Sequence, residues 1–136
     1  MVECFDIAAA RHYRDGTLLG RHKCAPNADQ LFGFAAECAI KAALVTLPGC
    51  TEGGSLASKY QKHVDRLWHI AGLQSLQRRF PGLLAVLRAL QHPFADWSTD
   101  DRYGPDDAIS PEALERHREA ARRLLGGLGL AGIRQQ

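Results

Sequence analysis

The sequence predicts a single all-α domain, an up-and-down bundle of four to five helices, from three observations. Ala and Leu supply 38 of the 136 residues and Val and Ile only 9, so helix formers far outnumber the β-branched residues that favour sheets. Apolar residues recur at helical spacing in several segments, with Pro or Gly between one segment and the next. Short connections of this kind favour antiparallel neighbours. We therefore expect residues 1–136 to form one helical domain.

Two helices are expected in the first third of the chain. The first covers about residues 4–19. The second has the clearest pattern, because Pro26-Asn27 offers a turn and an N-cap. Asp29 then lies in the first turn, where the helix dipole favours an anion. Pro48-Gly49 ends this helix, and a loop rich in Gly, Ser and Thr is expected over residues 50–58.

Two further helices are expected in the middle of the chain. The third covers about residues 59–79 and is broken by Phe80-Pro81-Gly82. The fourth, over residues 83–90, is short and apolar, and Pro93 ends or kinks it. An Asp-rich loop is expected over residues 95–109.

The last helix has a well-marked beginning. Ser110 is placed to act as its N-cap and Pro111 as its first helical residue. Its apolar stripe consists of Leu114, Ala121, Leu124, Leu125 and Leu128. Four glycines at 126, 127, 129 and 132 are expected to fray its end, so that the last eight or so residues form a flexible tail.

Composition excludes several classes of protein. The net charge of +2 is too balanced to indicate nucleic-acid binding by itself, although 13 of the 17 basic residues are Arg, which suits two-point contacts with phosphates. No stretch approaches the ~20 apolar residues that a membrane-spanning helix needs. Glu3 and Asp6 are unlike the basic start of a signal peptide. We therefore expect a cytoplasmic protein without a membrane partner.

The sequence carries no recognisable metal or cofactor motif. Cysteines at positions 4, 24, 38 and 50 form no C-x-x-C pair, and no two Cys or His positions have the spacing of zinc ligands. A Gly-rich phosphate loop, a nucleophile elbow and a metalloprotease helix are all missing from the sequence. We expect reduced thiols, no metal and no cofactor.

Polar residues on two of the predicted helices are candidates for chemistry. Glu37 precedes Lys41 by four residues, which favours either a solvated ion pair or a polar cleft that a ligand or another chain enters. His63, Arg66 and His69 lie three residues apart, so they share one broad side of a helix and could bind phosphate and transfer protons. Each of the two histidines can equally have a structural or surface role.

The Asp-rich loop contains a compact group of aromatic and charged residues. Trp97 and Tyr103 bracket Asp100, Asp101 and Arg102. This arrangement can clamp the loop onto the bundle. It can also build a site in which an aromatic ring stacks on a base and the Arg102 guanidinium binds phosphate.

One segment resembles a known family. Asn27 to Lys41, NADQLFGFAAECAIK, is similar to the second-helix signature of HEPN-domain proteins, N-A-D-x-L-x-G-x-A-A-E-C-x-x-K. The stretch ARHYRD at residues 10–15 resembles the start of that family. His63, the loop from Trp97 to Tyr103 and the Arg-rich last helix fall where small bacterial members carry similar residues. The resemblance spans most of the chain.

The resemblance implies a helical bundle that is usually a homodimer. Many HEPN proteins are metal-independent endoribonucleases of toxin–antitoxin, phage-defence or RNA-processing systems, and an R-x4-6-H motif supplies their catalytic Arg and His. Others bind RNA, nucleotides or a partner without catalysis. No Arg in this sequence is followed by His five to seven residues later. The motif match therefore carries over only Glu37 and Lys41, as residues lining a cleft.

Three hypotheses of function follow. In the first, a HEPN-like homodimer binds RNA, a nucleotide or a protein partner such as an antitoxin, without the standard nuclease activity. In the second, the chain is a metal-independent endoribonuclease in which His63 transfers protons and Arg102 steadies the phosphate. In the third, it is a structural adaptor without a ligand, and the cleft around Glu37 and Lys41 is filled.

The first hypothesis assigns roles to particular side chains. Its site gathers Glu37, Lys41, His63, Arg102 and Tyr103. Arg102 binds phosphate and Tyr103 packs against a base. Asp29 and Trp97 are further candidates for ligand binding.

Overall fold

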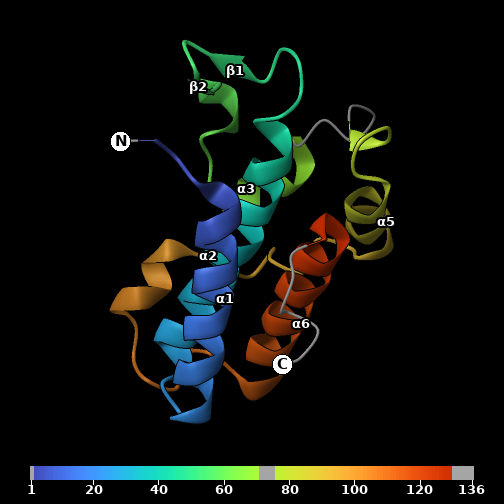
Figure 1. Ribbon diagram of the computed structural model, residues 1–136. Helices are drawn as coiled ribbons and strands as arrows, with labels where there is room; N and C mark the ends of the chain where they lie inside the picture. Colours follow the sequence, from blue (N-terminus) through green and yellow to red (C-terminus); the bar gives the residue numbers. More distant parts are fainter. Residues whose placement is uncertain (1, 71–75, 130–136) are drawn as a thin grey trace.

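The computed structural model describes residues 2–70 and 76–129, and this part of the chain is predominantly helical, as predicted. Three long helices, α1 (Phe5–Arg21), α2 (Ala25–Leu44) and α6 (Pro111–Leu128), run side by side, and two short helices, α3 (Val64–Ile70) and α5 (Pro81–Ala89), complete the fold (Figure 1). None of these helices is both long enough and apolar enough to cross a membrane.

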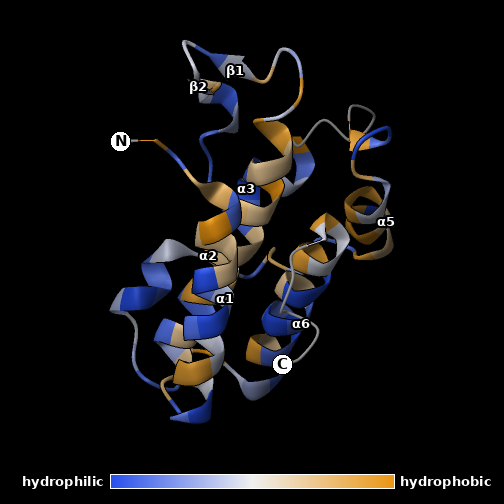
Figure 2. Cartoon of the chain, in the orientation of Figure 1, coloured by the Kyte–Doolittle hydropathy of each residue, from blue (hydrophilic) through white to orange (hydrophobic). Residues whose placement is uncertain are grey.

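Helix α2 is the centre of the bundle. Fourteen of its twenty residues are buried, and many of them are alanines. Small side chains allow α1 and α6 to pack closely against α2 from different sides. Figure 2 shows the contrast: α2 has hydrophobic colours over most of its length, whereas α1 and α6 carry several hydrophilic turns. Functional side chains on α2 are therefore held in a fixed position.

Contacts between side chains establish the directions of the helices. Tyr13 of α1 packs against Phe32 of α2 with ring centroids 5.8 Å apart, and the nitrogen of Lys41 lies 5.9 Å from the Phe5 ring, so α1 and α2 are antiparallel. Asp29 near the start of α2 bonds His117 near the start of α6, so these two helices run parallel. The connection that returns the chain between them contains α3 and α5.

The loop after α2 contains a minimal hairpin. Strands β1 (Thr51–Glu52) and β2 (Ser55–Leu56) pair antiparallel, with Thr51 opposite Leu56. Ser58–Tyr60 then forms a 3₁₀ turn, so the predicted third helix begins only at Val64. The predicted stretch at residues 71–75 lies outside the described residues. The fourth helix begins two residues earlier than predicted, at Pro81, because proline fits the first turn of a helix.

The predicted beginning of the second helix was wrong. Helix α2 begins at Ala25, with Cys24 at its N-cap position, so Pro26 lies in the first turn and Asn27 is not a cap. Asp29 consequently lies beyond the first turn, where it is fully buried and its charge is matched by a histidine rather than by the helix dipole.

The predicted beginning of α6 is confirmed. Ser110 Oγ accepts the Ala113 N–H at 3.0 Å, and Pro111 opens the helix. The predicted fraying at Gly126 and Gly127 was wrong, because the helix continues to Leu128 and ends at Gly129 in the left-handed conformation (φ 81°). Of the predicted tail, residues 130–136 lie outside the described residues.

Gly33 allows the closest approach between α2 and the loop after α5. A Cβ atom at Gly33 would lie only 2.1 Å from the Trp97 ring, which is 2% exposed. The Trp97 indole N–H also donates to the Asp29 carbonyl at 2.9 Å. Trp97 is therefore the clamp that fixes this loop to the bundle.

We expect Gly33→Ala to destabilise the protein although alanine favours helices. The added methyl must displace Trp97, and overpacking of this kind costs about 1–3 kcal/mol. Gly20→Ala is the matched control, because a Cβ at Gly20 meets no atom within 4 Å. Urea denaturation should show a loss for Gly33→Ala and no loss for Gly20→Ala. Equal stability of the two variants would contradict the role of Trp97.

Candidate functional site

Glu37, Lys41 and His63 meet at the edge of the bundle, and we call these three residues the Glu37 cluster. Lys41 Nζ donates to Glu37 Oε2 at 3.0 Å, and His63 Nδ1 lies 3.0 Å from Glu37 Oε1. The Glu37 and Lys41 side chains are only 10% and 8% exposed, so they are not a solvated surface pair. Burial of a carboxylate is costly unless it is paired, and here each carboxylate oxygen has a partner.

The His63 ring is held in one orientation. His63 directly precedes α3, and its carbonyl accepts the Leu67 N–H at 2.8 Å. Its ring lies beside Phe34 and Trp97, with centroid distances of 6.0 and 6.3 Å. Among the described residues, no group bonds its Nε2 atom, and the side chain is 54% exposed. Nε2 is thus the atom of the Glu37 cluster that can meet a ligand.

A hollow of about 270 Å³ lies at His63. Its walls come from the segment at the start of α3 and from the loop after Trp97. The lining residues are Gln61, Lys62, His63, Asp65, Arg66, Ser98, Thr99 and Asp100. They include two cations, two carboxylates and two hydroxyls, so the hollow is strongly polar.

This arrangement can perform two kinds of chemistry. With a proton on Nδ1 shared with Glu37, neutral His63 presents a lone pair at Nε2, and protonated His63 presents a donor there. Lys62 and Arg66 can attract a phosphate, while the hydroxyls and carboxylates of the same hollow can bond donor groups such as ribose hydroxyls. His63 and Arg66, which were expected on one side of a helix with His69, line the same hollow, although His63 lies just before α3; the His69 ring packs against that of His92.

Two titratable groups near the Glu37 cluster, His12 and Cys38, are partly or fully buried and are less accessible to a ligand than His63. Burial, and then the Arg11 charge, lower the pKa of His12, whose ring lies 5.9 Å from Phe34. Burial and the nearby Glu37 charge raise the pKa of the Cys38 thiol to about 12, so this thiol stays protonated at neutral pH. All four cysteines are free.

Arg102 and Tyr103 lie elsewhere, so the five residues expected in one site are not brought together. Arg102 lines a separate hollow of about 290 Å³ with Asn27 near the beginning of α2. Asn27 precedes Glu37 by ten residues, which is about 15 Å along a helix. The Arg102 guanidinium lies 4.8 Å from the centroid of the Tyr103 ring, and Tyr103 is 78% exposed.

Asp29 and Trp97, two predicted ligand-binding residues, are instead buried, with the Trp97 indole bonded to the Asp29 carbonyl and the Asp29 carboxylate in a network that reaches the surface at Asp96. Asp29 Oδ1 lies 2.6 Å from His117 Nδ1, and His117 Nε2 lies 2.9 Å from Asp96 Oδ1. Arg116 bonds Asp96 through both carboxylate oxygens. The network joins α2, the loop after α5 and α6.

His117 was not among the predicted functional residues. It lies three residues after Leu114 and four before Ala121, so it occupies a position on the apolar stripe of the last helix. A histidine at such a position is a signal that it has a buried partner. Burial opposes its charged form, but hydrogen bonds and charges from Asp29 and Asp96 outweigh this effect and raise its pKa.

The described ranges contain no group of three His, Cys, Asp or Glu side chains arranged to hold a metal ion.

Comparisons with family models, with curated proteins and with solved structures find no match to this chain.

The His117 network should make stability depend on pH. Because the folded-state pKa lies above 6.5, stabilisation by His117 is complete below about pH 6.5 and declines as the pH rises through the folded-state pKa. His12 and His92 have lowered pKa values and act in the opposite sense, so a variant is needed to isolate His117.

Asp96→Asn is suited to this purpose, since Asp96 is half exposed and its loss leaves Asp29 in place. We expect the variant to have a lower His117 pKa, measured by titration of the ring protons in NMR spectra. Its unfolding free energy should also fall less between pH 6.5 and 9. An unchanged His117 pKa would contradict the assignment.

Proposed function

We propose that this chain is a HEPN-like helical protein that binds RNA, and that His63 and Arg66 contact the RNA in the hollow at the Glu37 cluster. The observation that carries the proposal is the His63 ring, fixed by Glu37 with Nε2 free, in a hollow that also contains Lys62 and Arg66. The resemblance of residues 27–41 to the HEPN second helix supports the same site through Glu37, the matched residue that bonds His63; Glu37 and Lys41 themselves are buried behind the hollow and do not line it.

The mixed charges of the hollow favour a ribonucleotide chain over a bare anion. Lys62 and Arg66 can neutralise phosphates, and Arg66 can do so with two parallel hydrogen bonds. Asp65 and Asp100 would repel an anion that offers no donors, but they can accept hydrogen bonds from 2′-hydroxyls or base amino groups. A ligand with both kinds of group satisfies the whole lining.

We propose further that the protein is a cytoplasmic homodimer and belongs to a defence or toxin–antitoxin type system. In such a system a protein partner such as an antitoxin acts on it. This part rests on the resemblance alone. Sedimentation analysis of the purified chain tests the dimer, and a monomeric mass at micromolar concentration would contradict it.

Binding can be measured by fluorescence anisotropy with a labelled single-stranded RNA of about twelve nucleotides. We expect Arg66→Gln to weaken binding about fivefold and to reduce the slope of log K against log salt by about 0.7, because one phosphate contact is lost. Arg88→Gln is the control, since Arg88 is an exposed arginine of α5 outside the hollow. Equal affinities of the two variants would contradict the proposed site.

A second candidate function, metal-independent RNA cleavage, is favoured by the Glu37–His63 pair. In that reaction Nε2 of His63 takes the proton of a 2′-hydroxyl, and the 2′-oxygen attacks the adjacent phosphorus. The bond between phosphorus and the 5′-oxygen then breaks, the 5′-oxygen takes a proton from water, and a 2′,3′-cyclic phosphate remains. Arg66, rather than the distant Arg102, would stabilise the charge on the phosphorane.

Incubation with RNA in the presence of EDTA separates the two functions. A binding protein leaves the RNA intact, whereas the nuclease produces fragments that end in a cyclic phosphate. We expect His63→Ala to abolish any such cleavage and His69→Ala, which changes an exposed histidine of α3 outside the hollow, to preserve it. Cleavage that survives in His63→Ala would exclude His63 as the proton-transferring residue.

A further inference from the structure

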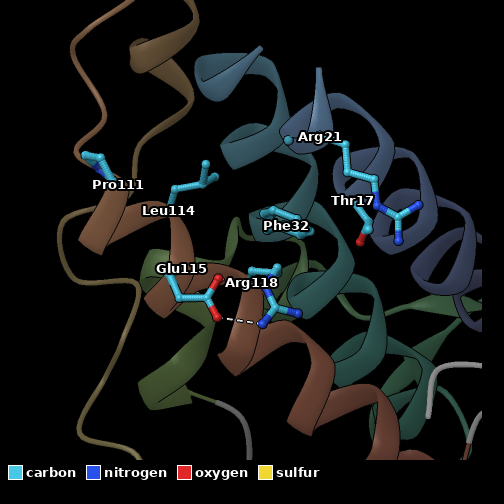
Figure 3. Close-up of a pocket in the computed structure, with 8 residues that line it drawn as sticks. Thr17, Arg21, Phe32, Pro111, Leu114, Glu115 and Arg118 are labelled. Atoms are coloured by element: carbon cyan, nitrogen blue, oxygen red, sulfur yellow. Dashed lines mark hydrogen bonds and ion pairs between the residues drawn. The ribbon is translucent and has the colours of Figure 1, made fainter. Parts of the chain in front are cut away.

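A third hollow, of about 430 Å³, lies between α1, α2 and α6, away from the Glu37 cluster. Its lining residues are Thr17, Gly20, Arg21, Phe32, Pro111, Leu114, Glu115 and Arg118. Figure 3 shows Pro111 and Leu114 on one side and Thr17 and Arg21 on the other, with Phe32 between them. The volume lies within the usual range for sites that take small molecules.

Two glycines one turn apart on α1 show how the hollow is formed. A Cβ at Gly16 would lie 2.9 Å from the Phe32 ring, so close packing of α1 on α2 requires glycine at that position. At Gly20 a Cβ would meet no atom within 4 Å, and packing places no such demand. Glycine within a helix is less favourable than alanine. Its effect at position 20 is to leave the hollow open.

The floor of the hollow is apolar and its rim is charged. Leu114 and Pro111 form apolar surface, and Phe32, which is only 1% exposed, closes the hollow between the two sides. Arg118 is held in place by Glu115, and its Nη1 also donates to the Tyr13 hydroxyl at 3.2 Å. Figure 3 marks the bond between Glu115 and Arg118. The charge of Arg118 is thus already matched.

Arg21 is the unmatched charge on this rim. Within the described part of the chain, no carboxylate lies within 4.0 Å of its guanidinium. The three charged lining residues, Arg21, Arg118 and Glu115, therefore leave one net positive charge. A singly charged anion balances the Arg21 charge, while Glu115 stays paired with Arg118.

We propose that this hollow binds a small organic acid with an apolar body and a single carboxylate. The apolar body contacts Leu114 and Pro111 beside the buried Phe32 ring, and the carboxylate accepts two parallel hydrogen bonds from Arg21. The site is independent of RNA binding at the Glu37 cluster, so either proposal can fail without the other.

The probe for the test is 3-phenylpropanoate, titrated into the isotope-labelled full chain and followed by NMR. We expect saturable shifts of Phe32 and Leu114 signals, with a dissociation constant on the order of 1 mM or lower. The neutral 3-phenylpropanamide should bind roughly tenfold more weakly. Absence of saturable shifts at these residues overturns the proposal.

Two variants test the assigned residues. Gly20→Leu should fill the hollow and abolish binding without lowering the melting temperature, because leucine favours helices more than glycine does. Gly126→Leu is the matched control, since Gly126 also lies in a helix with no atom within 4 Å of its Cβ position. Unchanged binding by Gly20→Leu overturns the proposal.

Arg21→Gln should reduce the affinity for the acid roughly tenfold and leave that for the amide unchanged. An equal loss for both probes overturns the role of Arg21. N-acetylphenylalanine presents its carboxylate as the C-terminus of a peptide does. It should bind more weakly than 3-phenylpropanoate. The reverse order would reject a small acid and assign the hollow to the C-terminus of a peptide.

Discussion

The buried pair between Asp29 and His117 determines how the rest of this molecule is arranged. Asp29 is fully buried in α2 and His117 is 1% exposed in α6, so neither charge is solvated. The cost of burying them is offset by their mutual contact at 2.6 Å and by Asp96, which bonds the other nitrogen of the ring. Because the pair comes from α2 and α6, it sets the distance and register between these two parallel helices.

The same network determines the position of the candidate site. Asp96 precedes Trp97, and the Trp97 indole donates to the Asp29 carbonyl while its ring covers Gly33. The loop is thus held on α2 by two contacts of Trp97, a hydrogen bond to Asp29 and packing on Gly33. Trp97 then packs against Phe34 and His63, so the ring that meets Glu37 is supported by residues that the buried pair has fixed. A structural residue such as Trp97 consequently affects the site without contacting a ligand.

Capping residues and apolar spacing predicted where most helices lie in the sequence. They could not predict that α2 is covered by other segments on most of its surface. Ser110-Pro111 determines the start of α6 through local bonds, and the sequence predicted it correctly. The pattern of Glu37 and Lys41 also fits an exposed helix face, because four-residue spacing does not reveal whether another segment covers that face. Burial of this pair depends on contacts with segments distant in the sequence.

Contacts between segments distant in the sequence also explain why only part of the candidate site was predicted. Spacing placed His63 and Arg66 together because they are neighbours along one short segment. Arg102 was grouped with His63, but the Ser98–Asp101 bonds begin a 3₁₀ turn, Thr99–Tyr103, that places Arg102 near the start of α2. No periodicity in the sequence reports such a change of direction within a loop.

A spectrum of the His63 ring shows directly whether Glu37 orients it to meet RNA. A proton–nitrogen correlation spectrum of the histidine side chains reports which nitrogen carries the proton and whether RNA contacts the ring. We expect neutral His63 to carry its proton on Nδ1, facing Glu37, and its Nε2 signal to shift saturably as single-stranded RNA is added. A proton on Nε2 in the neutral ring, together with signals that RNA leaves unchanged, would contradict both the orienting role of Glu37 and the proposed site.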